Sequence, residues 1–216
     1  MPALFPAWAD SVFRSALLGG VVLAAGVPAL GMWIARSPAM TGEGEPIEQP
    51  VKFDHRHHVK DDGIDCLYCH VDAQRSRFAG VPATSVCMGC HDQVWTQSPE
   101  LAPVRASAKS GAPIVWNRVN ALPQHVFFDH RIHVAKGVGC ETCHGRVDQM
   151  AAVRQEEPLT MKWCLECHRA PEKFLRPREN VTTMGFVPDR PQDEIGPALV
   201  AKYDVHPTTD CSGCHR

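Results

Sequence analysis

The hydrophobic positions of this chain are concentrated in one stretch near its N-terminus. Residues 16–35 (ALLGGVVLAAGVPALGMWIA) carry no charge and are bracketed by Arg14 and Arg36. An apolar run of this length is about what a helix needs to cross the hydrocarbon core of a bilayer. The pattern therefore predicts one membrane-spanning helix over residues 16–35.

A cleaved signal peptide is the competing interpretation of the same stretch. The apolar region of a signal peptide is normally about 7–15 residues long and is followed by a small-residue cleavage site. Here the run is longer, and no clear A-x-A triplet follows it. We therefore expect an uncleaved anchor over residues 1–36, joined to the rest of the chain by a Pro/Gly/Glu linker over residues 37–50.

Beyond the linker, the chain shows neither long periodic apolar segments nor a strand-rich run. Proline is frequent, with 18 in the chain, and Ser98-Pro99-Glu100 predicts a short helix with Ser98 as its N-cap. The expected fold class is mostly irregular and helical, with short helices and loops. Something other than side chains must then fill the interior.

The composition of the chain is unusual in its high content of Cys and His. The chain has 10 Cys and 12 His, whereas Lys+Arg of 22 against Asp+Glu of 24 leaves a net charge of −2. Without a basic excess, nucleic acid is excluded as the main partner, because neutralising phosphates requires clustered Lys and Arg.

All the cysteines fall in C-x-x-C pairs, and each pair is followed directly by His. The five motifs are Cys66, Cys69 and His70; Cys87, Cys90 and His91; Cys140, Cys143 and His144; Cys164, Cys167 and His168; and Cys211, Cys214 and His215. C-x-x-C-H is the attachment signature of c-type haem. On a helical turn these three positions share a face, so two thiols reach the haem vinyl groups while the imidazole reaches the iron.

The alternatives explain the motifs less well. A disulfide framework leaves the five histidines unexplained, and an odd number of C-x-x-C pairs does not fit Cys₄ zinc sites. We therefore expect five covalently bound haem c groups. Because haem c is attached outside the cytoplasm, we expect the N-terminus to be cytoplasmic. The haem domain would then lie on the periplasmic side of a bacterial inner membrane.

An internal repeat organises the haem domain. The segment 51–59 (VKFDHRHHV) recurs as 126–134 (VFFDHRIHV), and each copy precedes two C-x-x-C-H motifs. The first Cys follows the Phe by 13 residues in copy one and by 12 in copy two. This predicts a dihaem module over 51–91, a connector over 92–125, a second dihaem module over 126–168, and a C-terminal segment over 169–216 with the fifth haem.

The repeat also selects candidate distal ligands. His55 and His58 correspond to His130 and His133, and residues three apart on a helical turn can reach two different haems. Imidazole on both sides makes the iron six-coordinate, which suits electron transfer. His57 corresponds to Ile132, so we expect it at the surface or at a haem edge.

Four distal histidines leave one iron without a ligand from the repeat. His125 has no counterpart in copy one, and we expect it to be solvated or to contact a propionate. Met184 and His206 are the favoured candidates for the fifth distal ligand, and Met150 and Met161 are the others. A Met ligand would raise the potential of that haem.

The F-x-H-x-x-H pattern followed by C-x-x-C-H resembles multihaem cytochromes of class III. Segments 115–130, 137–150 and 159–169 resemble more particularly the pentahaem cytochrome subunit of alternative complex III. Asn120 departs from that family, in which His is usual at this position, so no ligand is carried over to it.

The resemblance implies an electron-transfer subunit, not itself an enzyme, of a membrane quinol:acceptor oxidoreductase. Its implied partners are an iron–sulfur subunit and polytopic quinol-binding subunits. The implied acceptor is a monohaem cytochrome, a soluble carrier or a terminal oxidase. Two alternatives are a tetrahaem-type quinol dehydrogenase, which oxidises quinol at its own haem, and a multihaem reductase, which needs an open iron.

Overall fold

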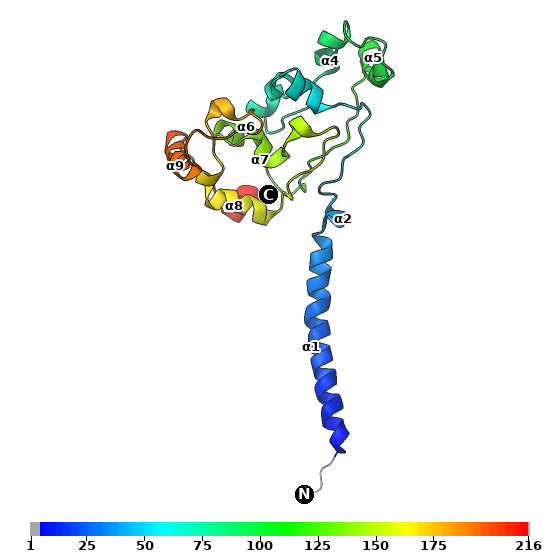
Figure 1. Ribbon diagram of the computed structural model, residues 1–216, viewed down its shortest axis with the longest axis vertical. Coiled ribbons are helices and arrows are strands. Elements are labelled where there is room, and N and C mark those ends of the chain that lie inside the picture. The colour runs from blue at the N-terminus through cyan, green and yellow to red at the C-terminus, as the bar shows by residue number, and fades with distance from the viewer. Residues whose placement is uncertain (1–4, 216) are drawn as a thin grey trace. The chain divides into compact units, whose positions relative to one another are not determined.

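The computed structural model describes residues 5–215, with the side chain of Ala7 left out. Residues 1–4 of the predicted anchor and residue 216 of the predicted C-terminal segment lie outside the described residues. The chain divides into two compact units, residues 1–43 and 44–216. The described residues contain helices and isolated bridges but no strand, as the sequence predicts (Figure 1).

The first unit is a long helix and a short one. Helix α1 spans Ala7–Ala35 and so begins before the predicted 16–35, since Pro6 precedes its first turn and Asp10 pairs with Arg14 at 2.9 Å. Over Trp8–Ala35 it is long and apolar enough to cross a membrane, although a signal sequence would pass the same test. Helix α2 (Pro38–Thr41) ends at Gly42, whose φ of 73° lies in the left-handed region that favours glycine.

The second half of the predicted linker belongs to the second unit. The N–H of Gly44 donates to the carbonyl of Gln155 at 2.8 Å, and Pro46 forms an antiparallel bridge with Arg154. The amide nitrogen of the Gln49 side chain donates to the carbonyl of Asn117 at 2.8 Å. Backbone pairing thus holds residues 44–46 against the second unit, and a side-chain hydrogen bond holds Gln49. The polar, Pro-containing sequence of this segment does not predict these contacts.

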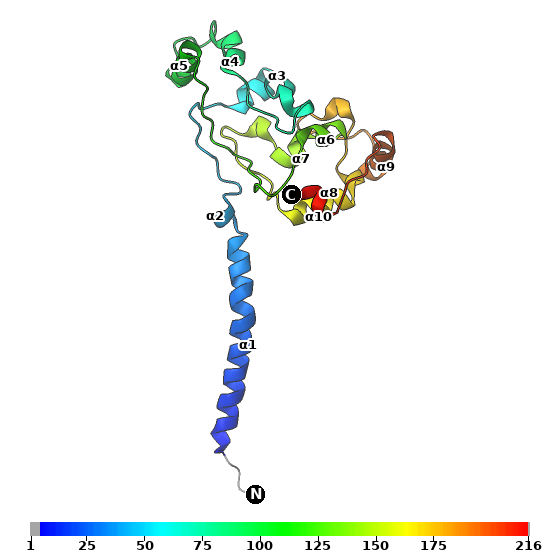
Figure 2. The same cartoon turned by 180° about the vertical axis from the view of Figure 1, so that it is seen from behind.

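The second unit consists of short helical segments, drawn in Figures 1 and 2. In chain order they are η1 (Arg56–Asp61), α3 (Cys66–Cys69), η2 (Val71–Gln74), α4 (Thr84–His91), η3 (Pro99–Leu101), α5 (Ala102–Ser110), α6 (His130–Ala135), α7 (Cys140–His144), η4 (Val147–Gln149), α8 (Met161–Arg169), η5 (Pro171–Lys173), η6 (Arg178–Asn180), α9 (Gln192–Lys202) and α10 (Cys211–Cys214).

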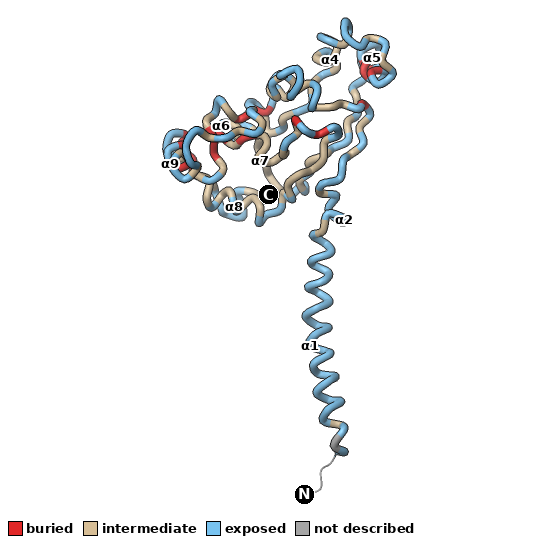
Figure 3. The backbone as a smooth tube through the Cα atoms, viewed as in Figure 1, coloured by how far each residue is buried: buried red, intermediate tan, exposed pale blue. Residues whose placement is uncertain are grey.

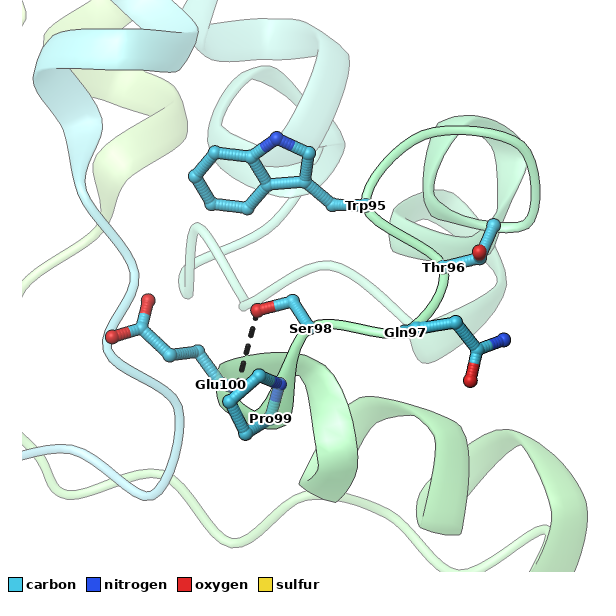
Figure 4. A pocket seen from close by; sticks show the side chains of 6 residues that line it. All are labelled: Trp95, Thr96, Gln97, Ser98, Pro99 and Glu100. Atoms are coloured by element: carbon cyan, nitrogen blue, oxygen red, sulfur yellow. Dashed lines mark hydrogen bonds between the residues drawn. The ribbon is translucent and has the colours of Figure 1, made fainter.

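The predicted start at Ser98 is confirmed. The Ser98 hydroxyl accepts from the backbone N–H of Glu100 at 3.3 Å, and Pro99 occupies the first helical position (Figure 4). Segment η3 begins there and leads directly into α5. This cap fixes the connector between the two predicted modules beside α4, against which α5 packs.

Side chains fill little of the interior of this unit. Most of the buried hydrophobic residues in the described part of the chain belong to two small clusters; Figure 3 colours buried residues red along the backbone. Leu175, Leu199, Tyr203 and Val205 form one, and Val51, Leu101 and Val104 form the other. Most of the remaining residues are exposed or half-buried. This distribution agrees with the expectation that bound groups supply much of the core.

Two close contacts hold distant segments together. Gly196 lets α9 lie directly on η5, because a Cβ at this position would collide with the carbonyl of Glu172. Helix α6 lies against η2, where the N–H of His130 donates to the carbonyl of Arg77 at 3.2 Å. Residues 71–77 of the first predicted module are therefore packed against α6 of the second.

Candidate haem sites

Each C-x-x-C-H motif lies on a helical turn, as its chemistry requires. In α3, α7 and α10 the first Cys begins the helix, whereas in α4 and α8 the motif forms the last turn. All ten cysteines are free of disulfides. Burial raises the pKa of Cys143 to about 12 and that of Cys167 to about 11, so both remain thiols at neutral pH. The motifs thus present paired thiols and an adjacent imidazole on one face.

Three motif histidines face a histidine of the repeat. The ring centroids of His58 and His91 lie 6.1 Å apart, those of His133 and His168 lie 6.1 Å apart, and those of His130 and His144 lie 6.2 Å apart. Each pair joins a residue of F-D-H-x-x-H-V to a C-x-x-C-H motif. The predicted distal residues are therefore placed opposite predicted proximal ones.

The fourth predicted distal residue, His55, lies near His70. Burial lowers the pKa of His55 to about 4, and the charge of His70 is the next contribution. In each copy of the repeat, the first histidine thus lies near the first motif that follows, and the second histidine lies near the second motif. The Nδ1 atom of His55 is buried without a hydrogen-bond partner.

The spacing of the facing rings fits a metal ion held between them. A metal bound by two imidazoles keeps each nitrogen at about 2 Å, so two such bonds and two half-rings separate the centroids by about 6 Å. The observed separations of 6.1–6.2 Å match this value. With paired thiols beside each motif histidine, the donor set fits c-type haem.

Hydrogen bonds on the far side of the rings leave the other nitrogen free for a metal. The Nδ1 atoms of six histidines lie 2.7–3.1 Å from backbone carbonyls, namely those of His58, His70, His91, His130, His133 and His168. A protonated Nδ1 that donates to a carbonyl fixes the tautomer whose Nε2 binds a metal. This is the usual outer support of a metal-bound histidine.

Burial also favours the neutral imidazole that a metal requires. It lowers the pKa of His144 to about 4 and is the main cause of the lowered pKa of His133. Removing water penalises the charged form of a histidine. These rings are thus neutral at physiological pH, in the state that coordinates iron.

The repeated phenylalanine orients both histidines of its copy. Phe53 stacks on His58 with centroids 4.3 Å apart and meets His55 edge-on at 4.7 Å. Phe128 does the same in copy two, at 4.5 Å from His133 and 4.8 Å from His130. This role of Phe53 and Phe128 is not among those predicted from the sequence. The signal for it is that a Phe recurs at the same spacing before the two histidines in each copy.

The aspartate and arginine of the repeat fix the backbone turn. Asp54 accepts from the backbone N–H of Arg56 at 2.9 Å and pairs with its guanidinium at 2.6 Å. Asp129 and Arg131 repeat both contacts, at 2.9 and 2.8 Å. The Arg56 hydrogen bonds lower the pKa of Asp54 to about 2, so this carboxylate stays ionised.

The two copies differ by one residue, and the helix type accommodates the difference. Copy two forms the α-helix α6, whereas copy one forms η1, a wider π-type turn in which the N–H of Asp62 donates to the carbonyl of His57 at 2.8 Å. A π-turn takes up more residues than an α-turn. The π-turn of η1 accommodates the extra residue between Phe53 and Cys66, which are 13 residues apart against 12 in copy two. His55 and His58 therefore lie near their motifs as His130 and His133 do.

Asn120 is a site residue whose role the sequence did not indicate. Its side-chain nitrogen lies 3.0 Å from Nδ1 of His144, and its amide oxygen is buried without a partner. When Nε2 of His144 binds a metal, Nδ1 carries the proton and needs an acceptor. With the amide in the opposite orientation, its oxygen would lie there and accept from that proton.

The remaining candidates lie in different surroundings. His57 is exposed and contacts Asp61 at 3.1 Å, in keeping with the surface position expected for it. His206 is 82% exposed and contacts Asp204 at 2.8 Å. Met184 is half-buried, Met150 is buried and Met161 is exposed. His125 is exposed, in keeping with the solvated position expected for it, and its ring lies beside that of His215, with centroids 5.6 Å apart.

The C-terminal part of the chain is similar to a known protein family. Residues 126–216 match the family described as cytochrome c7 and related cytochrome c. This region, with its three C-x-x-C-H motifs, is thus similar to multihaem c-type cytochromes, which bind their haem covalently.

Two proteins of Nitratidesulfovibrio vulgaris strain Hildenborough are similar to this chain. The menaquinone reductase multihaem cytochrome c subunit is 40% identical over 98 residues, which cover 45% of this chain and 46% of that protein. The high-molecular-weight cytochrome c is 25% identical over 131 residues, covering 48% of this chain and 24% of that protein. The chain therefore spans less than half the length of either relative. Neither is named as part of an alternative complex III.

Proposed function

We propose that this chain is a membrane-anchored pentahaem cytochrome c that relays electrons for a membrane complex linked to the quinone pool. The observation that carries the proposal is the set of histidine pairs at 6.1–6.2 Å, each with a C-x-x-C-H motif on one side. Haem c attached there would supply one-electron chemistry, and a six-coordinate iron is suited to electron transfer.

The protein's own contribution is to hold these centres in place. Phe53 and Phe128 fix ring orientation, and backbone carbonyls next to Nδ1 leave Nε2 free to bind a metal. Two imidazoles per iron leave no position open for a substrate, which argues against a multihaem reductase. A relay needs such closed centres.

The proposed anchor is α1. Its apolar length over Trp8–Ala35 suits a single crossing, with the N-terminus cytoplasmic and the haem unit on the periplasmic side. Residues 16–35 contain no His, Asp or Glu. Proton-accepting groups usually mark a quinol site inside a membrane. Quinone chemistry is therefore assigned to other subunits of the complex.

The resemblance to alternative complex III supports electron transfer from quinol through this chain to an acceptor. The partners would be an iron–sulfur subunit and polytopic quinol-binding subunits, with a monohaem cytochrome, soluble carrier or terminal oxidase as acceptor. The relative named as a menaquinone reductase subunit favours a second candidate, in which electrons flow towards menaquinone. Both candidates give this chain the same part, a relay without quinone chemistry of its own.

Quinol reduction tests the proposal. We expect the full-length chain, purified in detergent with its haems, to be reduced by a menaquinol analogue only at a negligible rate. Native membranes containing the complex should show prompt reduction or oxidation of the same haems on addition of quinol or quinone, respectively. Rapid reduction of the isolated chain, abolished by a quinol-site inhibitor, would overturn the relay and support a quinol dehydrogenase.

A further inference from the structure

The fifth C-x-x-C-H motif has a histidine beside it that does not belong to the repeat. The rings of His125 and His215 lie with centroids 5.6 Å apart and an interplanar angle of 24°. This separation is close to the 6.1–6.2 Å of the three facing pairs described above. Among those pairs, each combines one motif histidine with one histidine from elsewhere in the chain.

Backbone pairing brings His125 to this place. Val126 forms an antiparallel bridge with His215, and the N–H of Phe127 donates to the carbonyl of Cys214 at 2.7 Å. The N–H of Val126 also donates to the carbonyl of Pro123 at 2.9 Å, which closes a turn just before the bridge. The chain is thus fastened to the fifth motif directly after His125.

The two residues favoured from sequence are placed less well. His125 and His206 are both exposed, but the Nε2 atom of His206, which would have to bind iron, contacts Asp204 at 2.8 Å. Met184 precedes Gly185, whose N–H donates to the carboxylate of Glu141. Glu141 lies inside the third motif, so this contact holds the backbone next to Met184 at the third motif.

We propose that His125 is the distal ligand of the fifth haem, opposite His215. The inference rests on the proposed attachment of haem at Cys211 and Cys214. It gives segment 125–133 three distal imidazoles, from His125, His130 and His133, which would serve the fifth, third and fourth haems. It also closes the fifth iron to external ligands, so that the chain offers no open iron.

The test compares variants of the full-length holoprotein. His125→Ala should convert one low-spin haem signal in the low-temperature EPR spectrum to high spin. The ferrous form should then bind CO at one haem that is closed in the wild type. Added imidazole should restore the low-spin signal. His206→Ala and Met184→Leu are the matched controls, and we expect both to leave spectrum and CO binding unchanged.

A second variant covers the case in which His125→Ala does not assemble. His125→Met keeps a ligand at this position and should raise the potential of one haem alone. An opened iron in His206→Ala or Met184→Leu, or an unchanged spectrum in both His125 variants, would overturn the assignment. Mass spectrometry of the wild type separates this failure from that of the proposed function. If the wild type carries five haems and both His125 variants leave the spectrum unchanged, only the assignment of His125 as ligand is overturned. If it carries four haems, the pentahaem proposal is overturned as well.

Discussion

The imidazole rings of His130 and His144 lie parallel, with an interplanar angle of 2° and centroids 6.2 Å apart. They come from α6 and α7, which the turn around Gly137 connects. Gly137 has a φ of 86°, and a Cβ there would press on the carbonyl of Arg176. The glycine thus permits the reversal that sets one ring opposite the other.

Loss of the distal imidazole at this pair should open one iron. We expect His130→Ala to bind CO at one additional haem in the reduced state, because His130 is the imidazole that faces His144 among the described residues. His57→Ala is the matched control, since His57 is exposed and lies on the outside of η1. CO difference spectra check the result. An opened iron in His57→Ala, with His130→Ala closed, would show that the repeat has been aligned incorrectly.

Asn120 should tune the potential of the haem bound by His144. With its amide oxygen turned towards Nδ1 of His144, Asn120 would be a neutral acceptor for the Nδ1 proton, whereas Asn120→Asp would supply a carboxylate and make the imidazole more electron-donating. We expect this variant to lower one haem potential by about 60 mV or more, a tenfold change in a one-electron equilibrium. Asn120→Leu removes the acceptor and should shift the same potential upwards. Redox titration followed by EPR measures both shifts. If the potential of this haem moves in the same direction in both variants, or in neither, the role assigned to Asn120 is contradicted.

The pair between Asp148 and Arg146 should make stability depend on pH. Asp148 is buried and accepts from Arg146 at 2.8 and 2.6 Å, which lowers its pKa from the ordinary 3.8. A lowered pKa stabilises the fold above the ordinary value, and the gain is lost as the pH falls through the folded value. We expect Asp148→Asn to cost about 1–3 kcal/mol near neutral pH.

The difference between wild type and Asp148→Asn should shrink below about pH 4. Denaturant unfolding of the holoprotein at neutral and acidic pH measures it. Asp189→Asn, at an exposed position, is the control and should leave stability nearly unchanged. A cost for Asp148→Asn that stays constant across this pH range would show that the ion pair is not its source.

The parts of the site that follow from local chemistry were predictable from sequence. C-x-x-C-H fixes its own helical turn, and the repeat of F-D-H-x-x-H-V identifies four histidines because it occurs twice. The helix start at Ser98 follows from a cap and a proline within three residues. In each case the residues that interact lie close together in the chain.

Contacts between distant segments were not predictable in this way. His125 and His215 meet through a backbone bridge between segments 89 positions apart, and no side-chain pattern marks it. Asn120 reaches His144 from the connector, where it looked like a missing ligand. The pairing of residues 44–46 with 154–155 likewise depends on backbone groups, so the sequence indicated a linker.

The central claim is that all five motifs carry haem, and intact mass spectrometry of the purified mature chain tests it most directly. The account predicts a mass equal to the polypeptide plus five covalently attached haems, with none of the ten motif cysteines open to alkylation. Two or more unmodified C-x-x-C-H motifs, found as alkylated cysteines in the same chain, would contradict it.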